Sequence, residues 1–211
     1  MFSALLDTCV LVPSRARDVL LEIASTGAYR PLRGPGPLAE RWPGCWSTEI
    51  FDELDRTLRT LLGKRGTSPE EIDAYLTCLT RQMKTAFPDA LVTDWEPLVP
   101  TIHLPDPDDR HVVAAARTGR ADVIVTDNLA DFPPSALPAP LIRQSLDDFL
   151  LDELDLHPGQ VVTAVHAVAS RTGRSGPAMT AHDVATYLRA HGTPAFGDRL
   201  LATLTNRARS S

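Results

Sequence analysis

The sequence predicts an α/β protein: a parallel sheet with helices on both faces, followed by a small C-terminal helical extension. Short apolar runs at residues 3–7 and 121–126 have the composition of buried strands, and segments with helical periodicity alternate with them. Such alternation is typical of parallel sheets covered by helices. After residue 154 the pattern becomes helical only. We therefore expect one domain over residues 1–154 and a helical extension over residues 155–211.

Helix signals fill the space between the two predicted strands. They are strongest at Ser68, where a serine cap, a proline in the first helical position and Glu71 form a capping box. Residues 31–44 are rich in proline and glycine and indicate a loop, and an acidic turn at residues 104–109 leads into a helix that Gly119 ends. The helices expected in this part begin near residues 14, 47, 69 and 110, and a short strand is expected near residues 141–143.

Three further helices are expected in the extension. Residues 160–169 and 195–204 are amphipathic, and Thr180 with Asp183 three residues later predicts a capped helix start that Gly192 closes. No internal repeat and no low-complexity tract is present. The extension is therefore expected to follow the first domain without a long linker.

The composition is that of an ordinary globular protein. Hydrophobic residues make up 43% and charged residues 23%, and no apolar run approaches the roughly 18 residues that span a bilayer. The N-terminus reaches Asp7 without a basic segment, which argues against a signal peptide. Three cysteines, Cys9, Cys45 and Cys78, argue against a disulfide framework and against a cysteine-based zinc site. We expect a cytoplasmic protein with no membrane partner.

Negative charge is concentrated in the middle of the chain. Residues 67–155 hold 6 basic and 17 acidic side chains, against 21 and 27 in the whole chain. A segment this acidic either solubilises a surface or gathers carboxylates around a cation. The positions of the acids in the predicted fold favour the second interpretation.

Acidic side chains occur where a parallel sheet places its ligands. Asp7 and Asp127 follow the two predicted strands, Asp109 begins a helix, and Glu53 or Glu49 lies on the second helix. Each one alone is typical of a turn, a cap or a solvated helix face. Together they would repel one another by about 4 kcal/mol per close pair at an effective dielectric of 20, unless a cation intervenes. Oxygen ligands without histidine or cysteine favour Mg²⁺ or Mn²⁺, which support phosphodiester hydrolysis.

The order of these residues resembles a known family. Residues 5–11 are L-L-D-T-C-V-L, Glu53-Leu54 follow on a helix, residues 106–116 are D-P-D-D-R-H-V-V-A-A-A, and residues 125–133 are V-T-D-N-L-A-D-F-P. This combination resembles the PIN-domain ribonucleases, and within them the VapC-type toxins of bacterial toxin–antitoxin pairs. The likeness spans about residues 3–150, and the helical extension resembles that of some longer members.

The resemblance implies an endoribonuclease that uses Mg²⁺ or Mn²⁺ and a metal-activated water. It also implies a cognate antitoxin that occupies the site, and frequent homodimerisation. Carried over by position, Asp7, Glu53 and Asp109 are the first three acids, with Glu49 as an alternative to Glu53. The family's fourth acid would stand at Asn128, so Asp127, Asn128 and Asp131 remain alternatives for that role, and Thr8 and Thr126 are expected to orient the strand-end acids.

An acidic nuclease also needs groups that meet RNA. Candidates lie at the start of the first helix and around the proline-rich loop: Arg15, Arg17, Arg30, Arg33, Arg41, Trp42 and Trp46.

Two other functions remain open. A catalytically degenerate PIN domain that only binds RNA or protein is favoured by Asn128. A phosphatase of the haloacid-dehalogenase type would need a second aspartate where Cys9 stands.

Overall fold

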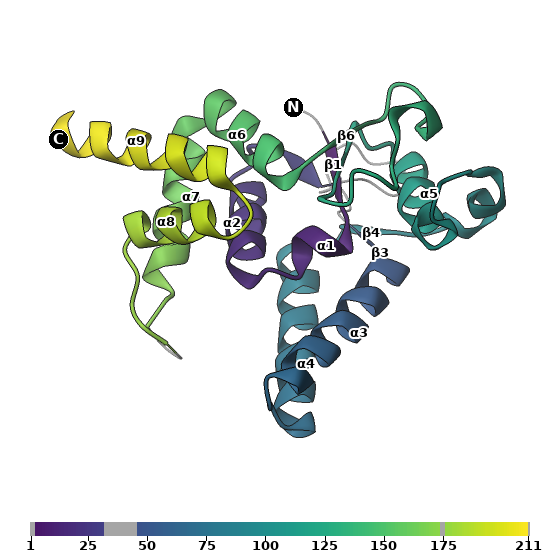
Figure 1. Ribbon diagram of the computed structural model, residues 1–211, viewed down its shortest axis with the longest axis horizontal. Coiled ribbons are helices and arrows are strands. Elements are labelled where there is room, and N and C mark those ends of the chain that lie inside the picture. Colours follow the sequence, from purple (N-terminus) through teal and green to yellow (C-terminus); the bar gives the residue numbers. More distant parts are fainter. Residues whose placement is uncertain (1–2, 32–45, 174–175, 211) are drawn as a thin grey trace. The chain divides into compact units, whose positions relative to one another are not determined.

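The computed structural model describes residues 3–31, 46–173 and 176–210, and the side chains of Arg30, Pro31 and Ser210 are outside this description (Figure 1). The chain divides into two compact units. The sheet unit comprises Phe2–Val12 and Arg30–Arg143, and the helical unit comprises Pro13–Tyr29 and Gln144–Ser211. The predicted boundary after residue 154 remains an expectation, and it falls within the helix α6 (Leu146–Leu156).

A sheet with the strand order β2-β1-β5-β6 forms the sheet unit's centre. β1 (Ser3–Leu6) pairs in parallel with both β2 (Arg30–Pro31) and β5 (Val123–Val125), and β6 (Ile142–Gln144) lies at one edge. Leu5 stands opposite Ile124, and neither is exposed. This complete burial explains why the two strands are continuously apolar. The predicted parallel sheet is confirmed.

Helices flank this sheet, as the sequence predicts. α5 (Arg110–Gly119) packs against β1 and β5, and α3 (Thr48–Lys64) packs against α4 (Pro69–Ala86) and against the short α1 (Thr8–Leu11). The capping box at the start of α4 is present, with Ser68 and Glu71 capping each other's backbone N–H groups. α3 runs through Gly63 and ends at Lys64.

Several short elements of the sheet unit have no counterpart in the sequence prediction. β3 (Trp46–Ser47) and β4 (Leu91–Val92) form a separate parallel pair. Two-residue strands are too short to leave a periodic pattern, so the sequence does not reveal them. The 3₁₀ helices are η1 (Glu96–Thr101), η2 (Pro107–Asp109) and η3 (Pro134–Ala136).

The helical unit contains α2 (Ser14–Ser25) and the C-terminal helices. Those helices are α6 (Leu146–Leu156), α7 (Pro158–Ser170), α8 (Ala181–Ala190) and α9 (Pro194–Ser210). α2 packs against α7 and α8, and α9 packs against α6 and α8. The rings of Tyr29 and Phe149 meet edge to face with their centroids 4.9 Å apart. The predicted C-terminal helices are confirmed, and none of the described helices is long and apolar enough to cross a membrane.

Candidate active site

Asp7 lies at the carboxyl end of β1, and its carboxylate is fixed by neighbouring donors. Oδ1 accepts a hydrogen bond from the Thr8 backbone N–H (2.7 Å), which caps α1. Oδ2 accepts hydrogen bonds from the Thr126 hydroxyl (2.6 Å) and from the Cys9 thiol (3.2 Å). Asp7 is only 5% exposed. Because β1 and β5 are adjacent, Thr126 after β5 meets the acid after β1, as parallel strand ends do.

Glu53 reaches the same region from α3. The Thr8 hydroxyl donates a hydrogen bond to Glu53 Oε2 (2.8 Å), so Thr8 connects Asp7 through its backbone and Glu53 through its side chain. Glu49, one helical turn earlier, instead forms an ion pair with Arg56 (2.9 Å). The contacts therefore connect Glu53, rather than Glu49, to the end of β1.

Asp109 is the point where the negative charges accumulate. It ends η2 directly before α5, and it is half-buried. Burial, followed by the charges of Asp7, Asp106, Asp131 and Glu53, raises the pKa of Asp109 to about 7. Carboxylates from four separate chain segments thus act on one another here.

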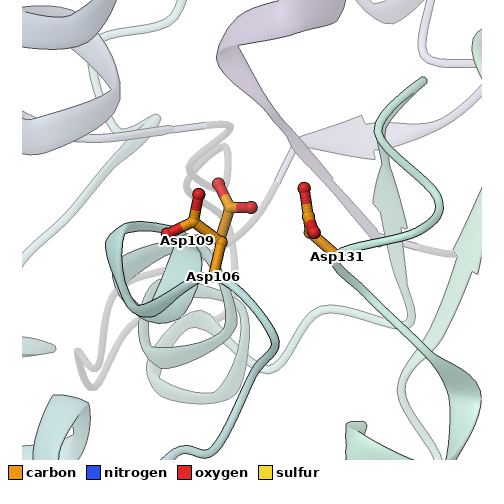
Figure 2. A group of neighbouring side chains, drawn as sticks. All are labelled: Asp106, Asp109 and Asp131. Atoms are coloured by element: carbon orange, nitrogen blue, oxygen red, sulfur yellow. The ribbon is translucent and has the colours of Figure 1, made fainter.

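Three of these carboxylates form a group that could hold a metal ion. Oxygen atoms of Asp106, Asp109 and Asp131 all lie within 4.8 Å of one another. Figure 2 shows Asp106 and Asp109 on the turn that leads into α5 and Asp131 on the loop after β5. Purely oxygen donors of this kind suit Mg²⁺ or Mn²⁺ better than zinc.

The structure distinguishes the three residues considered for the fourth acid. Asp131 belongs to the group of three aspartates. The Asn128 side chain donates a hydrogen bond to Asp109 Oδ2 (3.3 Å), and its backbone N–H donates to the Thr126 hydroxyl (3.0 Å). Asp127 is exposed, is not part of that group, and donates its backbone N–H to Cys9 Sγ (3.2 Å). The geometry therefore favours Asp131 and Asn128 over Asp127.

Comparison of the sequence with models of known protein families assigns the chain to a family. The model of the PIN domain matches residues 3–130, which is more than half of the chain. The chain belongs to the PIN-domain family. The model of the VapC50 C-terminal domain matches residues 146–202. The predicted resemblance to VapC-type PIN proteins is thereby confirmed.

One curated relative supports the same assignment over a shorter stretch. It is named "Putative ribonuclease VapC50", from Mycobacterium tuberculosis (strain ATCC 25618 / H37Rv). It is 58% identical over 50 residues, which are 23% of this chain and 30% of the relative. The alignment thus spans less than a third of that protein. No solved structure matches the chain.

Three residues of the candidate site were not among the residues predicted from the sequence. Asp106 accepts the Asp108 backbone N–H (2.9 Å) as a turn former, and only the density of acids in residues 106–109 signals it. Burial, followed by the charge of Asp7, raises the pKa of the Cys9 thiol to about 12, so Cys9 remains a donor to Asp7. His111 Nε2 lies 3.8 Å from Glu53 Oε2, and burial lowers the pKa of His111. The sequence does not indicate this role for His111, because a lone histidine on a helix has no recognisable metal-binding or catalytic spacing.

The residues suggested for RNA contact differ in how far they are buried. Trp46 is 1% exposed and packs edge to face against Phe51 and Phe87, at centroid distances of 5.2 and 6.0 Å. It is a core residue of the PIN domain, so the expectation that it stacks on RNA bases is wrong. Arg17 is 3% exposed and Arg15 is half-buried, both on α2. Outside the described residues or side chains lie Arg30, Arg33, Arg41 and Trp42.

Proposed function

We propose that this PIN-domain protein is an endoribonuclease that hydrolyses RNA phosphodiester bonds with Mg²⁺ or Mn²⁺. The convergence of carboxylates on Asp109, whose pKa is raised to about 7, is the observation that carries the proposal. Such crowding is unfavourable in the absence of a counter-charge, and a divalent cation supplies one. The name of the curated relative and the PIN-domain match support the ribonuclease assignment.

The aspartates Asp106, Asp109 and Asp131 are the proposed ligands, with Asp7 and Glu53 beside them. Their donor set fits a hard cation, because oxygen ligands are what Mg²⁺ and Mn²⁺ prefer. When bound, a divalent ion supplies a water molecule of lowered pKa and neutralises charge on the phosphodiester. Asp127, one of the residues predicted for the fourth ligand, is not part of this group of three and stays a prediction.

The remaining residues hold the carboxylates in place. Thr126 and Cys9 donate to one oxygen of Asp7, and the Thr8 backbone donates to the other. The Thr8 hydroxyl restrains Glu53 in the same way. Fixed anions lower the reorganisation that binding of substrate and ion requires, which is how preorganised sites accelerate reactions.

The toxin role is proposed from the resemblance to VapC-type proteins. It implies a cognate antitoxin that covers the carboxylates, and homodimerisation in solution. The match of residues 146–202 to the VapC50 C-terminal domain supports this assignment. Expression in a bacterial host is expected to arrest growth, and Asp7→Asn is expected to relieve the arrest. Light scattering measures the oligomeric state.

The direct test is RNA cleavage by the purified protein. We expect cleavage of single-stranded RNA with Mn²⁺, none with EDTA, and a loss of at least about a hundredfold in Asp7→Asn, since general loss of a catalytic group costs on this order. Gel analysis of end-labelled RNA measures the rate. Equal cleavage by wild type and Asp7→Asn would show that a contaminating nuclease cleaves the RNA.

The second candidate function is a degenerate PIN domain that binds RNA or protein without cutting. Asn128 in place of an acid is the feature that favours it. Metal-dependent RNA binding with no cleavage of any RNA, in an otherwise folded protein, is the result expected for that alternative. The phosphatase alternative is disfavoured by the family match and by Cys9 at the position of its second aspartate.

A further inference from the structure

A cleft of about 720 Å³ opens beside the carboxylates within the sheet unit. One wall is α3, and the other combines the start of η1 with the turn that leads into α5. The lining includes Glu53, Arg56, Thr57, Trp95, Asp109 and His111. Clefts of this size hold small organic ligands, and this one is continuous with the proposed catalytic carboxylates. The side chains that line the cleft are therefore placed to contact substrate that binds at these carboxylates.

Arg56 is the one permanently positive side chain among the residues that line this cleft, all of which the structure describes. Its guanidinium pairs with Glu49 (2.9 Å), and its side chain is 67% exposed. An ion pair this exposed contributes little to stability. A phosphate can therefore replace Glu49 and accept two parallel hydrogen bonds from the guanidinium.

Two aromatic side chains in the opposite wall have hydrogen-bonding capacity that the folded protein leaves unused. Within the described residues, Trp95 Nε1 and His111 Nδ1 are buried without a hydrogen-bond partner. The two residues are 7% and 9% exposed, and their ring centroids are 6.1 Å apart. Buried polar atoms are nearly always paired in native proteins. Both residues line the cleft, and the edge of a nucleobase carries donors and acceptors of the kind that these ring nitrogens lack as partners.

We propose that this cleft binds one unpaired nucleotide of the RNA, next to the phosphate that is cut. Arg56 contacts the adjoining phosphate, and Trp95 and His111 contact the base. The nucleotide is unpaired because a paired base has its hydrogen-bonding edge occupied, and RNA recognition of single bases uses such unstacked nucleotides. The assignment rests on the proposed function, since it places the substrate beside the same carboxylates.

A binding experiment tests the cleft without relying on catalysis. The probe is a fluorescein-labelled single-stranded RNA of mixed sequence, with Ca²⁺ as the divalent ion and a gel to check that the probe stays intact. Arg59→Gln is the matched control for Arg56→Gln, because Arg59 lies on the same helix, pairs with Asp55 (2.6 Å) and does not line the cleft. We expect Arg56→Gln to weaken binding about tenfold, the value of one charge-assisted contact. Arg59→Gln should leave binding unchanged, and Trp95→Phe should weaken it by several-fold.

Cleavage kinetics then separate this proposal from the proposed function. With Mn²⁺, Arg56→Gln should raise the KM for RNA about tenfold, with a smaller loss on bis(p-nitrophenyl) phosphate, which has no neighbouring nucleotide. Equal effects of Arg56→Gln and Arg59→Gln on binding, or equal losses on both substrates, would overturn the cleft assignment. RNA binding that depends on Arg56, without metal-dependent hydrolysis of either substrate, would uphold the cleft and overturn the hydrolase.

Discussion

Thr126 joins two chain segments of the site through a single hydroxyl group. It donates a hydrogen bond to Asp7 Oδ2 (2.6 Å) and accepts one from the Asn128 backbone N–H (3.0 Å). The residue is fully buried, so water cannot replace either contact. Its role is to fix the direction of the Asp7 carboxylate and the course of the chain that carries Asn128.

Replacing Thr126 by valine keeps the shape and removes the hydroxyl. We expect Thr126→Val to weaken Mn²⁺ binding several-fold and to lower stability by about 1–3 kcal/mol, because Asp7 Oδ2 loses a buried donor and the part-buried Asn128 N–H loses its acceptor. Electron paramagnetic resonance titration of Mn²⁺ and urea unfolding measure the two effects. Thr126→Ser keeps the hydroxyl and is the control. Unchanged Mn²⁺ affinity in Thr126→Val would show that Asp7 needs no such support.

Glu153 is a buried carboxyl in α6, away from the proposed catalytic residues in the sequence. The side chain is not exposed, and neither carboxylate oxygen has a hydrogen-bond partner among the described residues. Burial, followed by the charge of Asp152, raises the pKa of Glu153 from 4.5 to about 7. The folded protein therefore holds this proton more tightly than the unfolded chain does.

This difference makes the stability depend on pH. Between about pH 4.5 and pH 7 the folded state binds the Glu153 proton and the unfolded state does not, so stability falls as the pH rises through this window. The full loss, on the order of 3 kcal/mol, is present above pH 7. We expect the stability of Glu153→Gln relative to wild type to increase from pH 5 to pH 8. Urea unfolding at both pH values measures it, with the exposed Glu70→Gln as control, and a pH-independent difference would contradict the prediction.

Individual site residues were predictable where strand order dictates position. Asp7 and Thr126 follow adjacent parallel strands, so the sequence places them at one edge of the sheet. Asp109 is predictable as the acid at a helix start. The position of Asp131 is set by a loop whose path no local pattern encodes, and the sequence leaves it as one of three alternatives. For Asp131, the course of the loop after β5 is what the sequence could not provide.

At the level of elements, helix starts were the most predictable features. The capping boxes of α4 and α8 are present at Ser68 and Thr180, because each depends on residues only three positions apart. The strands β3 and β4 were not predicted. They depend on packing between distant segments, such as the pairing of Trp46 with Leu91.

The two capping boxes allow a matched test of local stability. Ser68→Ala removes the acceptor of the Glu71 N–H, and Thr180→Ala removes that of the Asp183 N–H. We expect each change to lower the free energy of unfolding by about 1 kcal/mol, the usual value of an N-cap. Mn²⁺ affinity should stay unchanged, because neither helix start contributes a proposed ligand. Urea unfolding followed by circular dichroism measures the loss, and a loss below a few tenths of a kcal/mol would show that the caps do not contribute.

At the level of the whole molecule, the chain passes repeatedly between its two units. It leaves the sheet unit after Val12, returns to it at Arg30 and leaves again after Arg143. α2 therefore belongs to the helical unit, although β1 and β2 on either side of it pair in the sheet. The sequence could not show this, because helical periodicity reveals that α2 has an apolar face and not which partner covers it.

This arrangement predicts that the C-terminal helices are required for folding. α2 packs against α7 and α8, and its buried residues include Val19, Leu20 and Ile23, none of them exposed. Full exposure of three such side chains costs about 5 kcal/mol or more, comparable to the whole stability of a typical domain.

We therefore expect a chain of residues 1–154 to aggregate or to bind the dye ANS strongly, with a lower and broader thermal transition than the full chain. A chain that ends at residue 205 is the control, because residues 205–209 are exposed, and it should behave as the full chain does. Gel filtration, ANS fluorescence and circular dichroism measure the outcome. A monomeric 1–154 protein with the full chain's melting temperature and Mn²⁺ affinity would mean that α2 needs no C-terminal partner and that the extension is a removable appendage.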